Sequence, residues 1–96
     1  MKTFDDLVFE KHAMAIEMES FTDRYSNATH AKLSFDNGYG VSVIFGDPFY
    51  SNGIDSYELA VLKDGDVCYN TPITDDVLGY LSKDEVTEVM KNIQGL

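Results

Sequence analysis

The sequence predicts an α+β fold: an antiparallel β-meander of about four strands, covered on one face by C-terminal helices. Two observations carry this prediction. Over residues 30–45 and 56–69, apolar and polar side chains alternate with the period of two that is typical of strands, and glycine-containing turns divide each segment into a hairpin. From residue 72 onward, this alternation gives way to helical spacing.

Length and composition favour one folded domain over residues 1–96. Hydrophobic residues make up 44% of the 96 residues and charged residues 25%, which is close to the usage of globular proteins. A chain of this size buries one modest core and leaves no room for an enclosed cofactor chamber.

The N-terminal third is expected to contain a helical turn, a strand and a loop. Thr3 is a suitable N-cap for a short turn within residues 3–9, and two acids follow it. Residues 12–18 alternate with period two, which favours a strand, although alanine and methionine there also suit a helix. Residues 20–29 are polar, which is typical of a loop.

The first hairpin joins residues 30–36 to residues 40–45. Its first strand places three apolar side chains on one face, and its second is rich in β-branched and aromatic residues. Asn37-Gly38 is expected to supply the positive φ angles of the tight turn. The core-facing residues of the first strand are Ala31, Leu33 and Phe35.

The second hairpin joins residues 56–62 to residues 67–69 through a turn that contains Asp64-Gly65. In its first strand, Tyr57, Leu59 and Val61 share one face.

The end of the chain predicts two helical segments, residues 74–81 and residues 82–96. Ser82 and Glu85 form a capping-box pattern at the start of the second helix. Its apolar stripe is expected to face the core, and its opposite face is expected to be solvated. The stripe consists of Val86, Val89, Met90 and Ile93, and the opposite face of Asp84, Thr87, Glu88 and Lys91.

Net charge is the strongest global signal. Seventeen Asp and Glu residues against seven Lys and Arg residues give a net charge of −10. Affinity for nucleic acid scales with the cationic side chains that replace phosphate counterions, so direct nucleic-acid binding is not expected. Attraction to an anionic membrane is not expected for the same reason. An acidic surface favours a partner protein with a basic surface, or serves solubility alone.

No pattern for catalysis, metal binding or cofactor binding is present, and the protein is predicted not to be an enzyme. Cys68 is the single cysteine, so no internal disulfide or multi-cysteine zinc site is expected. His12 and His30 lack the spacing of a metal-binding helix. The N-terminal residues lack the apolar region of a signal peptide, which predicts a reducing cytoplasm.

Residues for partner binding are predicted around the loop of residues 46–55 and at other acidic turns. The aromatic residues near that loop have two interpretations: Phe49 and Tyr50 anchor a partner, or Phe45, Tyr57 and Phe49 belong to the core. The predicted partner-binding residues are Asp47, Phe49, Tyr50, Asp55, Asp64, Asp66, Asp75 and Asp76.

The segments FDNGYGVSVI, YELAVL and ITDDVLGYLS resemble small acidic proteins encoded by bacteriophages and prophages, over about residues 33–93. The shared motifs are turns and strands, so the resemblance transfers no site residues. It implies a protein that acts in the cytoplasm of a bacterial host. Such proteins bind and block a host enzyme or defence complex, and anti-CRISPR proteins and nucleic-acid mimics are examples.

We therefore expect a binding protein that inhibits or modulates a host protein by occluding a basic surface. The alternative is a structural or assembly protein that self-associates through an exposed edge of its sheet.

Overall fold

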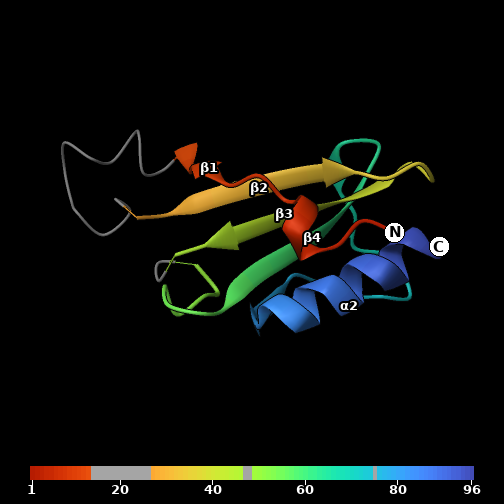
Figure 1. Cartoon of the computed structure of the whole chain (residues 1–96). Coiled ribbons are helices and arrows are strands. Elements are labelled where there is room, and N and C mark those ends of the chain that lie inside the picture. The colour runs from red at the N-terminus through yellow and green to blue at the C-terminus, as the bar shows by residue number, and fades with distance from the viewer. Residues whose placement is uncertain (14–26, 47–48, 75) are drawn as a thin grey trace.

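The computed structural model describes residues 1–13, 27–46, 49–74 and 76–96. Within these residues, an antiparallel sheet carries a C-terminal helix on one face (Figure 1). The elements in chain order are η1 (Phe4–Asp6, a 3-10 turn), β1 (Glu10–Lys11), β2 (Thr29–Ser34), β3 (Tyr39–Phe45), β4 (Tyr57–Lys63), β5 (Asp66–Val67), β6 (Leu78–Leu81) and α2 (Lys83–Gln94).

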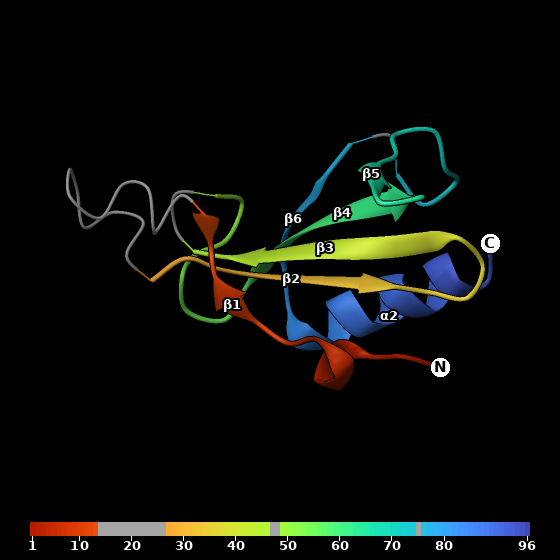
Figure 2. The same ribbon diagram turned by 90° about the horizontal axis from the view of Figure 1, so that it is seen from above.

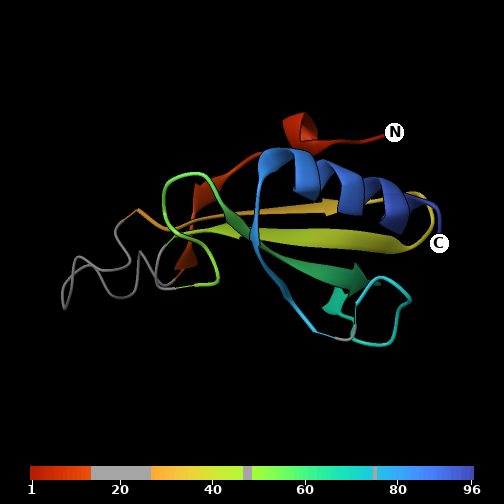
Figure 3. The same cartoon turned by 90° about the horizontal axis from the view of Figure 1, so that it is seen from below.

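The sheet confirms an α+β fold but contains more strands than the four expected. The strands lie in the order β1-β2-β3-β4-β5, and β6 also pairs with β4. β5 and β6 therefore share the outer edge of β4, each along one half. In Figures 2 and 3, which view the molecule from opposite sides, α2 lies on the same single face of the sheet. We call this the covered face and the other the opposite face.

The first hairpin is confirmed, with a turn that differs in detail. The Phe35 N–H donates to the Tyr39 carbonyl at 2.7 Å, which closes a three-residue loop. Gly38 alone has a positive φ, of 85°, as expected where a type I turn ends in a left-handed residue. The side chain of Asn37 instead links this turn to α2, because its Nδ2 donates to the Ile93 carbonyl at 2.9 Å.

The second hairpin is also confirmed. Asp64 and Gly65 have φ angles of 53° and 91°, the two consecutive positive angles that a type I′ turn requires. The return strand β5 covers only Asp66 and Val67, and Leu62 pairs with Val67.

The predicted helix over residues 74–81 is wrong. Residues Leu78–Leu81 form β6, which pairs with β4 at Tyr57 and Leu59. Half of the outer edge of β4 would otherwise present unpaired backbone groups, and β6 satisfies them. The pairing is irregular, and Tyr80 takes a positive φ of 56°, as in a β-bulge. Residues 76–96 therefore contribute one helix to the covering layer, not two.

The capping box of α2 is present as predicted. The Glu85 N–H donates to Ser82 Oγ at 3.1 Å, and the Ser82 N–H donates to Glu85 Oε1 at 3.0 Å. Three residues of the predicted stripe, Val86, Met90 and Ile93, are fully buried. The stripe packs on the covered face, whose most buried residues are Ala31, Val41, Val43, Leu59 and Val61.

The N-terminal residues pack beside α2. The turn predicted near Thr3 is confirmed as η1, and the Thr3 N–H donates to Asp6 Oδ2 at 2.8 Å. The Phe4 N–H donates to Thr87 Oγ1 at 3.0 Å, which fixes η1 against the helix. The predicted strand over 12–18 and the loop over 20–29 lie mostly outside the described residues, and β2 begins within the latter range.

Candidate partner-binding surfaces

Apart from Asp76, the predicted partner-binding residues that the structure describes lie in two groups, one at each end of β4. Tyr50 and Asp55 lie in the loop before β4, whereas Asp64 lies in the turn after β4 and Asp66 begins β5. The seven residues of β4 separate the groups by about 20 Å. Figure 1 shows the loop and the turn at opposite ends of the sheet. Asp76 is exposed just before β6, and Asp47 and Asp75 lie outside the described residues.

Hydrogen bonds hold the loop before β4 in one shape. Ser51 Oγ, which is buried, donates to the Ser56 carbonyl at 2.6 Å and accepts from the Gly46 N–H at 3.1 Å. Asn52 Oδ1 accepts from the backbone N–H groups of residues 54, 55 and 56 at 2.9–3.1 Å. Asn52 Nδ2 also donates to Asp55 Oδ1 at 2.7 Å, so the position of this carboxylate is fixed.

Two exposed tyrosines meet where the loop touches β6. Tyr50 is 57% exposed and Tyr80 is 62% exposed, and their ring centroids lie 6.4 Å apart. The Tyr80 N–H donates to the Tyr50 carbonyl at 2.9 Å. A Cβ at Gly79 would lie 2.9 Å from Tyr50 Cβ, so the close approach of the two segments requires glycine there.

The structure separates the two interpretations of the aromatic residues. Phe45 and Tyr57 pack on the covered face, with ring centroids 5.2 Å apart, and Tyr57 is only 8% exposed. Phe49 is half-buried, and its ring lies 4.6 Å from the His12 ring. Of the two predicted anchors, Tyr50 is exposed, whereas Phe49 packs against the His12 ring.

An open hollow of about 360 Å³ lies on the covered face beyond the N-terminal end of α2. Four aromatic rings form its walls, and their neighbouring centroids lie 5.0–5.8 Å apart. We call it the aromatic hollow. Its walls are Phe4, Phe9, Phe45 and Tyr57, and its rim consists of Thr29, Ile54, Asp55 and Lys83.

Charges of both signs border the aromatic hollow. Burial raises the pKa of the Tyr57 hydroxyl, and the nearby Asp55 carboxylate raises it further. Lys83 Nζ lies 5.5 Å from the centre of the Phe4 ring, within the range of a cation–π contact. Ile54, which belongs to the rim, is 80% exposed. The hollow thus combines aromatic faces with a fixed carboxylate.

A second depression, of about 490 Å³, runs along one flank of α2. Three carboxylates surround an apolar floor made by Leu81 and Val89, and none of the residues that line it is cationic. Two of its residues, Asp84 and Glu88, belong to the helix face that the sequence predicts to be solvated, whereas Val89 belongs to the predicted apolar stripe. We call this depression the acidic groove, lined by Leu81, Asp84, Glu85, Glu88, Val89 and Asn92.

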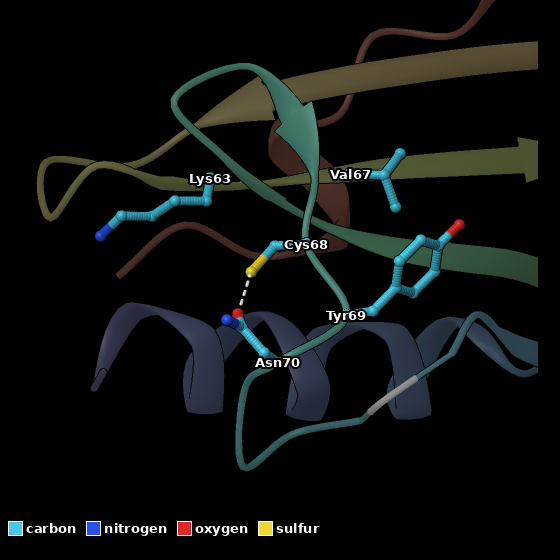
Figure 4. A pocket seen from close by; sticks show the side chains of 5 residues that line it. All are labelled: Lys63, Val67, Cys68, Tyr69 and Asn70. Atoms are coloured by element: carbon cyan, nitrogen blue, oxygen red, sulfur yellow. Dashed lines mark hydrogen bonds between the residues drawn. The ribbon is translucent and has the colours of Figure 1, made fainter.

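Figure 4 shows a third depression beside the β4–β5 turn, of about 520 Å³. The Cys68 thiol donates to Asn70 Oδ1 at 2.9 Å. Lys63 points away from the thiol, and its Nζ lies 4.0 Å from the centre of the Tyr39 ring. The lining, which is Lys63, Val67, Cys68, Tyr69 and Asn70, contains no general base to activate the thiol.

The opposite face of the sheet carries a polar cluster that the sequence analysis missed. His30 Nε2 lies within hydrogen-bonding distance of Ser42 Oγ, at 2.7 Å, and the His12 ring lies 5.5 Å from the His30 ring. Burial, then the charges of His12 and Lys32, lower the pKa of His30.

Among the residues that the structure describes, no three His, Cys, Asp or Glu side chains gather as a metal site would require. Within the same residues, no helix is long and apolar enough to cross a membrane.

Sequence reasoning found one rim residue of the aromatic hollow, Asp55, and two of its walls, Phe45 and Tyr57. It missed Phe4 and Phe9, because only the contact of η1 with α2 brings them to the sheet. The spacing of Asp84, Glu85 and Glu88 was a visible signal for the acidic groove, but its apolar floor depends on the position of β6.

In the described part of the chain, fold and surface together define a small α+β domain with carboxylate-lined depressions beside α2. The chain matches no protein-family model, no curated protein and no solved structure.

Proposed function

We propose that this protein is a non-enzymatic binding protein that covers a basic surface of a partner protein. The acidic groove is the observation that carries the proposal, because Asp84, Glu85 and Glu88 line it together with the apolar Leu81 and Val89, and none of its lining residues is cationic. Such a surface attracts a basic partner electrostatically and then excludes water at its centre. The net charge of −10 adds long-range attraction.

The resemblance to phage-encoded proteins supports a partner from a bacterial host. A host enzyme or defence complex that holds nucleic acid presents a basic channel, and an acidic domain seated there would block it. In this proposal the protein acts in the host cytoplasm, and it binds neither nucleic acid nor membrane directly.

Two charge-matched double variants test the proposal and locate the site. The first, Asp84→Asn with Glu88→Gln, removes two carboxylates of the acidic groove and leaves the Glu85 capping bond intact. The second, Asp64→Asn with Asp66→Asn, removes two predicted partner-binding carboxylates at the far end of β4. Each changes the net charge from −10 to −8, so any difference between them reflects position and not total charge.

The measurement is capture from bacterial lysate with mass spectrometry at low and high salt, followed by the affinity of each variant for the captured protein. We expect salt-sensitive binding that weakens roughly three- to tenfold in the groove variant, and little change in the turn variant. Loss only in the turn variant would keep the function and move the site to that turn. Equal, unchanged affinity in both variants would contradict the proposal.

Self-association through a sheet edge remains a second candidate function. In the described part of the chain, β1 pairs with the outer edge of β2 only at Thr29 and His30. No strand of the described residues pairs with the rest of that edge, although the exposed Lys32 opposes pairing with another strand. Sedimentation over a hundredfold concentration range tests this candidate: a constant monomer mass would rule it out.

A further inference from the structure

We infer that the aromatic hollow seats an arginine side chain of the partner, with the guanidinium stacked on the rings and bound to Asp55. This inference rests on the proposed function for the identity of the partner, but its chemistry is tested independently of any partner.

The walls of the hollow provide faces for a planar cation. Phe4, Phe9 and Phe45 are each only partly buried, and their rings gather around Tyr57. The volume of about 360 Å³ is near the lower end of ligand sites, about 300–1,000 Å³. Aromatic faces carry partial negative charge and attract cations.

The protein already places one of its own cations on this surface. Lys83 Nζ lies 5.5 Å from the centre of the Phe4 ring, which shows that the rings accept a positive charge. Lys83 is exposed and is the first residue of α2, so its side chain is free to move aside for an incoming group.

The carboxylate at the rim selects the occupant. Asp55 is held by Asn52 at 2.7 Å through one of its oxygens, Oδ1. An apolar occupant would take this carboxylate out of water with no compensating bond, which is unfavourable. A guanidinium both stacks on rings and donates to a carboxylate, whereas an ammonium group is a compact, strongly hydrated charge.

The inference predicts opposite effects for the two charged residues of the rim. Asp55→Asn removes the acceptor charge and keeps an oxygen for Asn52, so it weakens guanidinium binding. Lys83→Met removes a competing cation and keeps an aliphatic side chain, so it strengthens binding.

Matched controls at the far end of β4 have the same net charges. Asp64→Asn changes the net charge by the same amount as Asp55→Asn. Lys63→Met changes it by the same amount as Lys83→Met, and it also removes an ammonium group from an aromatic face, that of Tyr39.

The experiment is an NMR titration of the full chain with capped arginine, N-acetyl-arginine methylamide, and with its uncharged isostere, capped citrulline. Capped arginine is expected to shift the resonances of the hollow at lower concentration than capped citrulline. Asp55→Asn should weaken its binding about two- to fivefold, and Lys83→Met should strengthen it by a similar factor. Both control variants should match the wild type.

Equal binding of the two probes would overturn the inference, as would equal effects of Asp55→Asn and Asp64→Asn. The groove variant Asp84→Asn with Glu88→Gln separates the two proposals. If capped arginine does not bind selectively while partner capture depends on the groove, the inference falls and the proposed function stands. If capped arginine binds selectively but no partner is captured, the seat stands and the proposed function falls.

Discussion

The two faces of the sheet differ in the burial and polarity of their side chains, although the same strands form both. On the covered face, Val43 and Leu59 are directly paired and have no exposed surface. One residue along in each strand, Ser42 and Ala60 are paired on the opposite face, and His30 reaches Ser42 from β2. The covered face depends on packing under α2, whereas the opposite face retains half-buried polar groups.

This difference shows where a small domain has room for a binding surface. The centre of the helix–sheet contact is filled by fully buried side chains, among them Val86 and Met90 of α2. Both acid-bordered depressions lie at its margins: the acidic groove along a flank of α2, and the aromatic hollow beyond its first residue, Lys83. The helix that closes the core therefore also builds the two candidate surfaces.

The sharpest test of the comparison is a cavity in the covered face. Leu59→Ala removes a fully buried side chain and is expected to lower the free energy of unfolding by about 2–5 kcal/mol. Urea denaturation measures this loss. Lys32→Ala, at an exposed site on the opposite face, should change it by less than about 0.5 kcal/mol. Similar effects of the two variants would break the comparison.

The contact between β6 and the loop before β4 gives the next largest effect. In Gly79→Ala the new Cβ would lie 2.9 Å from Tyr50 Cβ, so one segment must shift. We expect a loss of about 1–3 kcal/mol in the free energy of unfolding. The chemical shifts of Tyr50 and Tyr80 should also change. Unchanged tyrosine resonances would show that this contact does not position them.

The helix cap is expected to contribute less. Ser82→Ala removes the acceptor for the Glu85 N–H and should cost about 1 kcal/mol of unfolding free energy. Thermal unfolding followed by circular dichroism measures it. Ser34→Ala, at an exposed strand position, serves as the control, and an equal change in both variants would argue against the capping role.

The opposite face should produce the smallest effect, and it should depend on pH. The pKa of His30 is lowered from 6.5 by burial, His12 and Lys32, so the unfolded chain binds a proton more readily than the folded chain. The contribution of His30 to the free energy of unfolding should therefore be fully present above about pH 6.5. It should be lost as the pH falls below that value. His30→Gln should flatten this part of the profile, and a profile identical to that of the wild type would contradict the assignment.

Local signals made the hairpins and α2 predictable. The positive φ angles of Asp64, Gly65 and Gly38 specify the two turns locally, and the Ser82–Glu85 box specifies the helix start locally. β6 was not predictable in this way, because residues 74–81 suit a helix locally and only the unpaired edge of β4 makes them a strand.

The candidate surfaces were less predictable than the fold, since each joins distant segments. The aromatic hollow requires Phe4 from the N-terminal turn to reach Tyr57 across the end of α2, and its rim includes Asp55 from a loop. The acids of α2 were visible as a charged helix face. Nothing in their spacing revealed that Leu81 would turn that face into a groove.

The most direct test of the central claim is a residue-level map of where a basic chain binds. The measurement is a ¹⁵N–¹H NMR titration of the full chain with a hexa-arginine peptide at physiological salt. The account predicts that shift changes concentrate on residues 81–92 and around Asp55, and are small at residues 63–67. Changes spread evenly over all exposed acids, or confined to the 63–67 turn, would contradict it.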